Sequence, residues 1–582
     1  MAAVLLPTLG ISTVRVMAGL GALKPWELLT VFAGLAFLAE LTGSEDRPAR
    51  ILRLPAFEAA NALPLAIAAL AVGLALVAAV GLPIWQWDSL GYHLPFVAYA
   101  LQAGGLAGVP WALPYIGSYP HGVELWDLGA RALLTDDHWL DAAQLPLCLC
   151  GAVAVAGLAR RAGALAGTAV AVGALWLCLP AVFLQLPSVY VDVASAAFFL
   201  MAAFWILSTP SFESTFLAGL SLGLFLSSKP SSPGATMVLG LGFAIGAWRA
   251  DRRILPLLAA ALALALGSES YLTNLASHGN PLWPVRIDLG PMHLQGRSSL
   301  SDLLAAGAAA PRLSGSLPSR MLRSWAALDP LPAFDMRVGG FGPLFLLFAL
   351  PLGLWGAFRR GGVWVIGLVA ALVTADPAIA RFTLPFPALL LALSGGELAR
   401  FGPALRATVT TWATALAAVG LWLALPGLTD GLPLRATLGL PIEAQEAALL
   451  PAETAGSWAA LRRALAPQTS IALDGSFDLT YLLWRPDLKN HVEPLPLDLR
   501  GQTLLDWIES RDIQLVISGR SSPGHQLALA HPERFAALFR CGASEPDCEV
   551  FAVGPTLREL ALHPEQGRLP EPAGPKAVDP TP

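Results

Sequence analysis

The sequence predicts a polytopic α-helical membrane protein with about thirteen transmembrane helices and a small α/β domain at its C-terminus. Hydrophobic residues make up 55% of the 582 residues and charged residues only 13%, against about a quarter in soluble domains. Apolar runs of about 20 residues recur along most of the chain. Beyond residue 429 these runs stop, and short strand-like segments replace them.

The membrane part is read from its apolar runs. We interpret as spans the runs Ala3–Ala22, Trp26–Leu41, Ala59–Leu82, Leu145–Leu158, Leu165–Phe183, Val189–Leu207, Phe216–Ser227, Ala235–Trp248, Ile254–Leu275, Phe341–Phe358, Val363–Val373, Phe382–Leu398 and Ala407–Leu425. A run of about 12 residues cannot cross about 30 Å of hydrocarbon at about 1.5 Å per residue. We therefore expect several of these helices to be broken, tilted or buried in the bundle.

Basic residues in the short loops set the expected orientation. If the spans alternate, one side of the membrane receives Arg47, Arg50, Arg53, Arg160, Arg161, Arg249, Arg252, Arg253, Arg359, Arg360, Arg400 and Arg406. The opposite loops hold only Lys24, Lys229 and Arg381. The first side is then cytoplasmic. Two long loops face outward: the first loop, Pro83–Gln144, and the second loop, Ala276–Gly340.

The expected domain organisation follows from these spans. Residues 1–57 form an N-terminal membrane hairpin and a cytoplasmic loop, and residues 58–428 form the transmembrane module. Short surface helices are expected in the first loop, and another at Leu300–Ala310 in the second loop. Residues 429–555 form an α/β domain outside the cytoplasm, and the Pro-rich residues 556–582 are expected to be disordered.

The tail domain is predicted from alternating and apolar segments. Ser470–Asp474, Ile513–Ser518, Phe535–Cys541 and Glu549–Val553 read as strands, and Thr503–Arg511 reads as a helix. Cys541 and Cys548 are close enough to join two neighbouring strands by a disulfide, provided that the compartment is oxidising.

Several function classes are disfavoured. The formal net charge of −5 does not indicate a basic surface of the kind that binds nucleic acid. The sequence has no phosphate-binding P-loop and no Rossmann glycine fingerprint. Its Gly-x-Ser-x-Gly match, Gly219–Gly223, lies inside an apolar run and not between a strand and a helix, so it is not a nucleophile elbow. Direct nucleotide hydrolysis, a nucleotide-sugar donor on a Rossmann fold and serine hydrolysis are therefore unexpected.

Asp88 stands among aromatic residues directly after an apolar run, in "PIWQWDSLGYHLP" (Pro83–Pro95). An ionisable residue near membrane depth is costly unless it lines a cavity, pairs or acts, which makes it a functional candidate. The alternative is that Asp88 caps a helix that starts near Leu90. Its position alone does not separate the two interpretations.

A set of motifs in a fixed order narrows the choice. They are "WDSLGYHLPFVAYALQAGGL" (Trp87–Leu106), "SYPHGVEL" (Ser118–Leu125), "SVYVDVASAAFF" (Ser188–Phe199), "SSKPSS" (Ser227–Ser232), "YLTNLASHGNPLWP" (Tyr271–Pro284), "GGFGPLF" (Gly339–Phe345) and "ARFTLPFPALL" (Ala380–Leu390). Together they resemble the bacterial membrane glycosyltransferases of the GT-C superfamily, near family 39 and the aminoarabinose and protein O-mannosyl transferases.

This resemblance implies an inverting transfer of a sugar from a polyprenyl-phosphate donor to an acceptor outside the membrane, such as a glycolipid, a glycan or a protein. Asp88 would be the general base that takes the proton of the acceptor hydroxyl. Lys229 and Arg381 would meet the developing charge of the phosphate. Alternatively, Lys229 only extends to the membrane interface and Arg381 pairs with Asp376.

Four further residues are candidates. Asp192, read as a helix-interior acid, would be a second catalytic residue. His93, His121 and Asn280 would bind substrate. The alternatives are that the histidines are hydrogen-bonded spacers and that Asn280 shapes a turn.

One departure from the resembled group leaves a question open. Several relatives carry paired acids in the first loop, whereas Ser89 follows Asp88 here. Either Asp88 acts alone, or Asp192 or the Asp136–Asp137 pair supplies the second carboxylate. A divalent cation is possible, since Asp136, Asp137 and His138 offer ligands.

The main rival function is a transporter or flippase of a lipid-linked substrate. Such proteins place their polar groups near the membrane midplane on broken helices, often within internal repeats. Here the ionisable candidates gather at outer span ends and in the long loops, which favours chemistry outside the membrane. A non-catalytic assembly subunit is the second rival.

Overall fold

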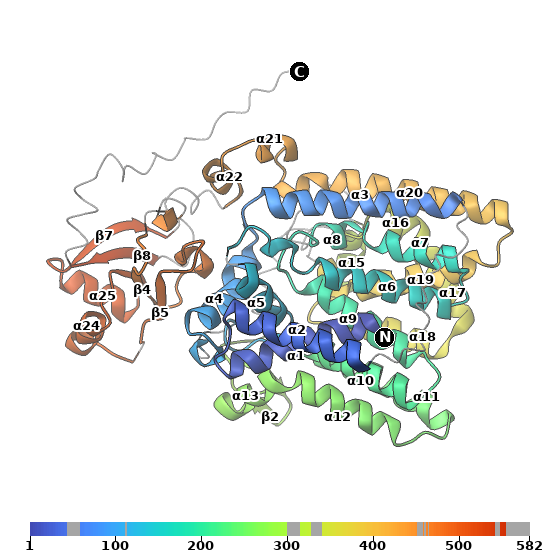
Figure 1. Ribbon diagram of the computed structural model, residues 1–582, viewed down its shortest axis with the longest axis horizontal. Helices are drawn as coiled ribbons and strands as arrows, with labels where there is room; N and C mark the ends of the chain where they lie inside the picture. The colour runs from blue at the N-terminus through green and yellow to red at the C-terminus, as the bar shows by residue number, and fades with distance from the viewer. Residues whose placement is uncertain are drawn as a thin grey trace.

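The computed structural model describes residues 1–42, 59–110, 113, 115–134, 136–299, 315–326, 340–450, 458, 461–463, 465–496, 498–541 and 548–554. The predicted surface helix Leu300–Ala310 and the predicted disordered tail at 556–582 lie outside these residues. A helical bundle forms most of the molecule, with its helices along the long axis, and the C-terminal α/β domain lies at one end (Figure 1).

The bundle is built from helices of unequal length. They are α1 (Ala2–Gly19), α2 (Pro25–Thr42), α3 (Ala59–Gly81), α6 (Leu145–Arg161), α7 (Ala166–Trp176), α8 (Pro180–Phe183), α9 (Asp192–Ile206), α10 (Phe212–Leu226), α11 (Ser232–Arg249), α12 (Leu255–Gly267), α13 (Glu269–His278), α16 (Gly342–Leu344), α17 (Leu350–Arg360), α18 (Gly362–Ala370), α19 (Pro385–Leu398) and α20 (Pro403–Ala424). A π-helical turn at Phe345–Ala349 joins α16 to α17. Proline in the first turn starts α19 and α20, where its missing N–H costs nothing.

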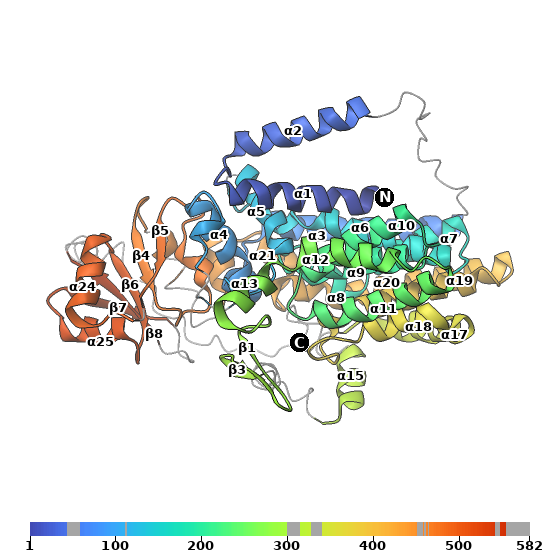
Figure 2. The same ribbon diagram turned by 90° about the horizontal axis from the view of Figure 1, so that it is seen from below.

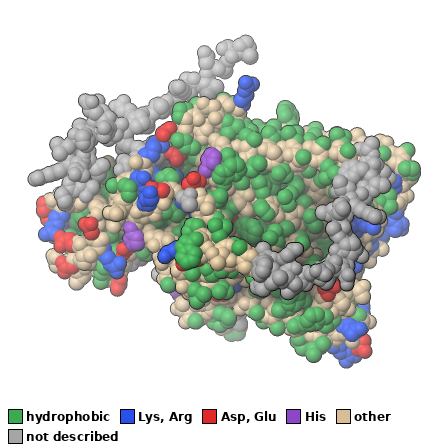
Figure 3. Space-filling view, viewed as in Figure 1, with side chains coloured by type: hydrophobic (Ala, Val, Ile, Leu, Met, Phe, Trp, Pro, Cys, Tyr) green, Lys and Arg blue, Asp and Glu red, His purple; other side chains and the backbone are tan. Residues whose placement is uncertain are grey.

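The chain is a multi-pass membrane protein. Within the described residues, five helical stretches are long and apolar enough to cross a membrane: Ala2–Gly19, Asn61–Gly81, Leu140–Arg161, Gly342–Arg360 and Pro403–Thr429. A sixth is possible if the bent pair α12 and α13 counts as one. Hydrophobic side chains cover the flank of the bundle, while charged ones gather on the C-terminal domain and at the opposite end (Figure 3).

The predicted count of about thirteen spans is not confirmed. The run Ile254–Leu275 was predicted as one span, but the helix breaks at Ser268 and bends by 66°. The run Leu165–Phe183 also divides, because α7 ends at Trp176 and α8 begins at Pro180. Helices α7, α9, α10 and α19 are shorter apolar helices, and α19 is buried along its whole length. These short helices fill the inside of the bundle, as their length predicted.

The first loop folds into short helices at one end of the bundle. A π-helical turn, Ser89–His93, leads into α4 (Leu94–Gln102), and α5 (Gly122–Leu134) follows. The short helices predicted for this loop are therefore present, and the rest of the chain buries most of both. Their position along the membrane surface stays a prediction. The backbone N–H of Gly122 donates to the Ser227 carbonyl at 2.7 Å, and a Cβ at this glycine would lie 2.2 Å from Ser227 Oγ. Only glycine permits this approach, which seats α5 beside the loop that carries Lys229.

The described part of the second loop contains a small three-stranded sheet and a helix. Strands β1 (Val285–Leu289), β2 (Met292–Leu294) and β3 (Ser298–Ser299) pair in the order β2-β1-β3, and α15 (Leu317–Trp325) follows. The sheet lies beside α13, below the bundle in the view of Figure 2.

The C-terminal domain follows two short helices, α21 (Leu434–Leu438) and α22 (Ile442–Leu449). Its five strands are β4 (Ser470–Leu473), β5 (His491–Pro494), β6 (Leu515–Gly519), β7 (Phe535–Arg540) and β8 (Cys548–Val553), in the order β5-β4-β6-β8-β7. Strands β5, β4 and β6 are parallel, and β8 and β7 are antiparallel to their neighbours. The domain also contains the helices α24 (Gly501–Ser510) and α25 (Pro523–Ala530) and a 3₁₀ helix at Thr480–Leu483.

The predictions for this domain were nearly complete. All four predicted strands and the predicted helix are present, and Cys541 and Cys548 form a disulfide. Strand β5 was missed because "HVEP" carries two ionisable residues and a proline, which an edge strand tolerates. The boundaries of the predicted domains at 57, 428 and 555 stay predictions.

Candidate functional site

Asp88 lies at the start of the π-helical turn, and its side chain makes no capping hydrogen bond there. Instead, Arg381 Nη1 donates to Asp88 Oδ2 at 2.6 Å, while the backbone N–H of Asp88 donates to the hydroxyl oxygen of Tyr190 at 3.1 Å. The capping interpretation of Asp88 is therefore wrong. Both charged groups are buried, so this is an ion pair of the interior and not of the surface.

Asp192 joins the same group of charges. It is the first residue of α9, so the sequence prediction of a helix-interior acid was wrong. Lys229 Nζ, from the turn between α10 and α11, donates to Asp192 Oδ1, and Arg381 Nη1 lies 3.6 Å from Asp192 Oδ2. We call Asp88, Asp192, Lys229 and Arg381 the charge cluster. It contains two carboxylates and two cations, and its formal charge is zero.

Aromatic side chains hold the two cations in place. Lys229 Nζ lies 4.4 Å from the centroid of the Phe382 ring, and the Arg381 guanidinium lies 5.1 Å from that of Tyr190. Such contacts are favourable where water is excluded. Arg381 belongs to the short 3₁₀ helix Ala380–Thr383. Its predicted alternative partner, Asp376, pairs with Arg320 at 2.6 Å instead.

Two opposing effects set the ionisation of Asp88, which lies in the first loop outside the membrane-spanning helices. Burial raises the pKa of the Asp88 carboxyl group. Arg381 and, to a smaller extent, His93 lower the same pKa by more, so it lies below its ordinary value of 3.8. Asp88 is therefore ionised at neutral pH.

His93 lies beside the charge cluster but pairs elsewhere. Its Nδ1 is 2.7 Å from Oε1 of Glu124, and both side chains are buried. The pair joins the π-helical turn to α5, so it fixes the segment that carries Asp88. Sequence reasoning missed Glu124, because an acid on a predicted surface helix is expected to face water.

The structure places His121 and Asn280 in supporting positions. His121 Nε2 is 2.8 Å from the Ile116 carbonyl oxygen, and its ring stacks on Phe96 at 3.9 Å between centroids. The Asn280 amide donates to the Val285 and Gln295 carbonyls, each at 2.8 Å. These contacts match the alternatives of a spacer and a turn-shaping residue.

The second carboxylate of the site comes from Asp192 and not from the Asp136–Asp137 pair. Asp137 accepts from Arg131 at 3.0 Å, from the Tyr481 hydroxyl at 2.6 Å and from Arg462 at 2.9 Å. It thereby binds the C-terminal domain to the first loop. Asp136 Oδ1 accepts from the backbone N–H of His138 at 3.0 Å.

The sequence alone did not decide whether the protein binds a metal ion. Across the described ranges, no group of three or more His, Cys, Asp or Glu side chains is arranged to hold a metal ion. The two acids of the charge cluster are engaged with Lys229 and Arg381.

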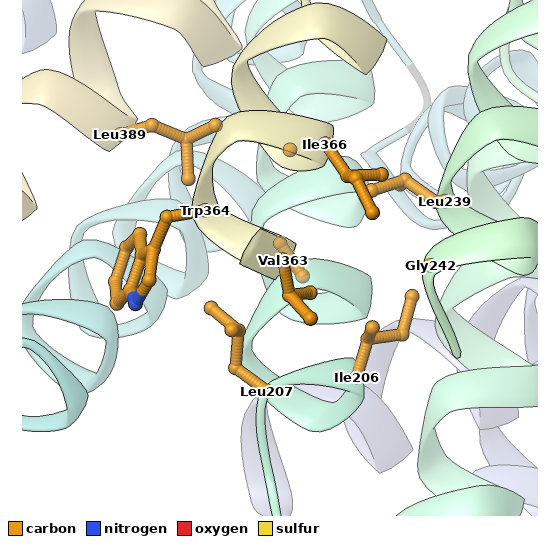
Figure 4. Close-up of a pocket in the computed structure, with 10 residues that line it drawn as sticks. Ile206, Leu207, Leu239, Gly242, Val363, Trp364, Ile366 and Leu389 are labelled. Carbon is orange, nitrogen blue, oxygen red and sulfur yellow. The ribbon is translucent and has the colours of Figure 1, made fainter. Parts of the chain in front are cut away.

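An apolar pocket lies away from the charge cluster. It is formed by α9, α11, α18 and α19, with Ile206, Leu207, Val363 and Trp364 among its lining residues (Figure 4). Ile206 and Asp192 stand at opposite ends of α9, about 20 Å apart at about 1.5 Å per residue. A wholly apolar lining offers no group for chemistry, so we place the site at the charge cluster.

Comparisons with known proteins support the fold. No family model matches the chain, and a search of curated proteins gives no match. The structure is similar to that of ArnT from Cupriavidus metallidurans in the apo state, with 13% identity and a TM-score of 0.53 over 86% of this chain and 99% of that chain.

Two other solved structures are more distant. ArnT from the same organism bound to undecaprenyl phosphate matches with 13% identity and a TM-score of 0.49, over 85% of this chain and 98% of that one. The oligosaccharyltransferase of Archaeoglobus fulgidus in the apo form matches with 14% identity and a TM-score of 0.41, over 84% and 74%. On the evidence of the match to apo ArnT, this chain shares the fold of that protein over most of its length.

Proposed function

We propose that this chain is an inverting glycosyltransferase that moves a sugar from a polyprenyl-phosphate donor to an acceptor outside the cytoplasm. The observation that carries the proposal is the charge cluster, in which Arg381 pairs with Asp88 while Asp192 lies against both Lys229 and Arg381. A glycosyl transfer from phosphate needs a base for the acceptor and cations for the leaving group. The GT-C fold supports the same reading.

Lys229 and Arg381 are the proposed phosphate-binding residues. The bond between the anomeric carbon and the phosphate oxygen breaks, and negative charge grows on the departing phosphate. Hydrogen bonds from cations to phosphate oxygens are strong, and they strengthen as this charge develops in a site shielded from water. The Arg381 guanidinium has five N–H donors and can therefore form hydrogen bonds to the phosphate. When it turns to the phosphate, it gives up its hydrogen bond to Asp88.

Asp88 is the proposed general base. Once Arg381 turns to the phosphate, the Asp88 carboxylate takes the proton of the acceptor hydroxyl while that oxygen attacks the anomeric carbon. Attack from the face opposite the phosphate inverts the anomeric configuration. Asp192 contacts both cations, and in this proposal it orients Lys229 and Arg381 through the reaction.

The proposal includes a location. The charge cluster and the C-terminal domain lie at the end of the bundle that the basic residues predict to face outward. A bacterial inner membrane would supply the lipid-linked donor, and a glycolipid, a glycan or a protein outside the cytoplasm would be the acceptor.

The test measures donor consumption. Purified protein is incubated with a panel of polyprenyl-phosphate sugars, and donor loss is compared between wild type, Asp88→Asn and the control Asp136→Asn, which removes an exposed acid of the same loop. We expect Asp88→Asn to lose about 10²- to 10⁴-fold in turnover and Asp136→Asn to keep it. Equal turnover in wild type and Asp88→Asn, or no turnover with any donor, contradicts the proposal and favours a transporter or an assembly subunit.

A further inference from the structure

Three tyrosines of the first loop form a cluster beside Asp88. The ring centroids of Tyr92 and Tyr119 are 5.7 Å apart with an interplanar angle of 83°, and those of Tyr115 and Tyr119 are 5.2 Å apart at 69°. Tyr92 and Tyr115 are 6.3 Å apart. We call these residues the tyrosine cluster. All three side chains are half-buried, so each ring packs on its neighbours and keeps part of its surface open.

The backbone at Tyr115 is held in an unfavourable conformation. Its φ angle is +67°, in the left-handed region that favours glycine and is unusual for a bulky residue. A glycine would relieve this strain, yet the position carries an aromatic ring in contact with Tyr119. Strain of this kind persists where the surrounding structure enforces it and gathers at functional sites. The ring at Tyr115 is therefore a candidate for a function that glycine cannot perform.

The tyrosine cluster leads directly to the charge cluster. Tyr92 lies in the π-helical turn that follows Asp88, and Tyr92 and Tyr119 are both within electrostatic reach of the Asp88 carboxylate. Tyr115 is also within electrostatic reach of Arg297 of the second loop and Asp478 of the C-terminal domain. Three parts of the chain therefore meet around these rings, with charges of opposite sign beside Tyr115.

We propose that the tyrosine cluster binds a saccharide ring of the acceptor. That this saccharide belongs to the acceptor of the reaction rests on the proposed function. Exposed faces of tyrosine rings pack against the apolar C–H faces of a sugar, while phenol hydroxyls, Arg297 and Asp478 can bond its hydroxyl groups. The formal charge of the charge cluster is zero, so it favours an acceptor that carries no net charge. A bound sugar then presents one hydroxyl towards Asp88.

A peptide acceptor fits this surface less well. Extended peptides are bound by adding a strand to a free sheet edge. The edge strand that contacts the first loop is β5, where Gln102 already accepts from the Val492 N–H at 2.8 Å and donates to the Val492 carbonyl at 3.0 Å. Stacking on rings needs no such edge.

The test measures sugar binding without any donor. Full-length protein in a detergent that has no sugar headgroup is titrated with glucose, galactose, mannose, N-acetylglucosamine and lactose, and binding is followed by saturation-transfer NMR. We compare wild type with Tyr115→Gly, Tyr119→Ala and the control Trp507→Ala, a half-buried aromatic residue of α24. Tyr115→Gly should fold at least as stably as wild type, because glycine accepts the positive φ angle.

We expect at least one saccharide to bind wild type and Trp507→Ala, and both tyrosine variants to bind it about two- to tenfold more weakly. No saccharide binding by wild type, or unchanged binding by Tyr115→Gly, overturns the inference. Binding of an unglycosylated peptide that the same two variants abolish also overturns it. Wild type that binds a saccharide through these tyrosines but consumes no donor supports the inference and counts against the proposed function alone.

Discussion

The ion pair between Asp88 and Arg381 is best probed by a double-mutant cycle of Asp88→Asn, Arg381→Gln and the double variant. At 2.6 Å and an effective dielectric constant of about 20, the gross attraction is about 6 kcal/mol, and desolvation of the two buried groups offsets much of it. Each single variant leaves one unit of uncompensated charge in the cluster. Such a loss costs about 3–5 kcal/mol of unfolding free energy.

The double variant restores the balance of charge, because Asp192 and Lys229 remain paired. We therefore expect it to be more stable than the sum of the single effects predicts, with an interaction energy of about 2 kcal/mol or more. Thermal unfolding in detergent reports the effects, since about 2 °C of Tm corresponds to about 1 kcal/mol in a large domain.

The control combines Asp88→Asn with Glu397→Gln, which disturbs the separate pair that Glu397 forms with Arg360. Distant changes should add within about 0.5 kcal/mol. The reasoning is refuted if Asp88→Asn and Arg381→Gln add in the same way, because the pair would then contribute no coupling of its own.

Three further predictions concern activity, pH and the C-terminal domain. Because the pKa of Asp88 is lowered, the contribution of its carboxylate to stability is full above about pH 4 and is lost as the pH falls through that pKa. In Arg381→Gln, the rise in pKa that burial causes is no longer offset by the guanidinium, so the pKa of Asp88 rises. The acid limb of the pH–rate profile should then move to higher pH. Lys229→Met should lower kcat by about 10²-fold or more, whereas Lys229→Arg should retain part of the rate, and single-turnover kinetics with the lipid-linked donor separate this from weaker binding. Asp137→Asn weakens the contacts of residue 137 with Arg131 and Arg462. If these contacts hold the C-terminal domain to the first loop, hydrogen exchange should become faster in the strand β5 and in the π-helical turn Ser89–His93. Unchanged exchange there would show that Asp137 does not hold the C-terminal domain to the loop.

Much of the fold was predictable because composition and periodicity are strong signals. The apolar runs gave the membrane class, and alternation gave four of the five strands in the C-terminal domain. The span count failed where local sequence hides a break, as at Ser268, where helix α12 meets α13 inside one continuous apolar run. Length alone could not separate a short span from a helix buried within the bundle.

The charge cluster was predictable only in part. All four of its members stood out as ionisable residues near membrane depth, but Asp88 and Arg381 are 293 positions apart, and no local pattern encodes their contact. Motif resemblance also drew attention to His121 and Asn280, whose side chains serve the loops that carry them. Glu124 and the tyrosine cluster carried no sequence signal of their own, because their significance lies in which side chains they meet.

The most direct test of the central claim is a cryo-electron microscopy structure of the full chain with a polyprenyl-phosphate sugar bound, using Asp88→Asn to prevent turnover. The account predicts the phosphate within hydrogen-bond distance of Lys229 and Arg381, with the anomeric carbon facing residue 88. A phosphate bound at a distance from both cations would contradict the account.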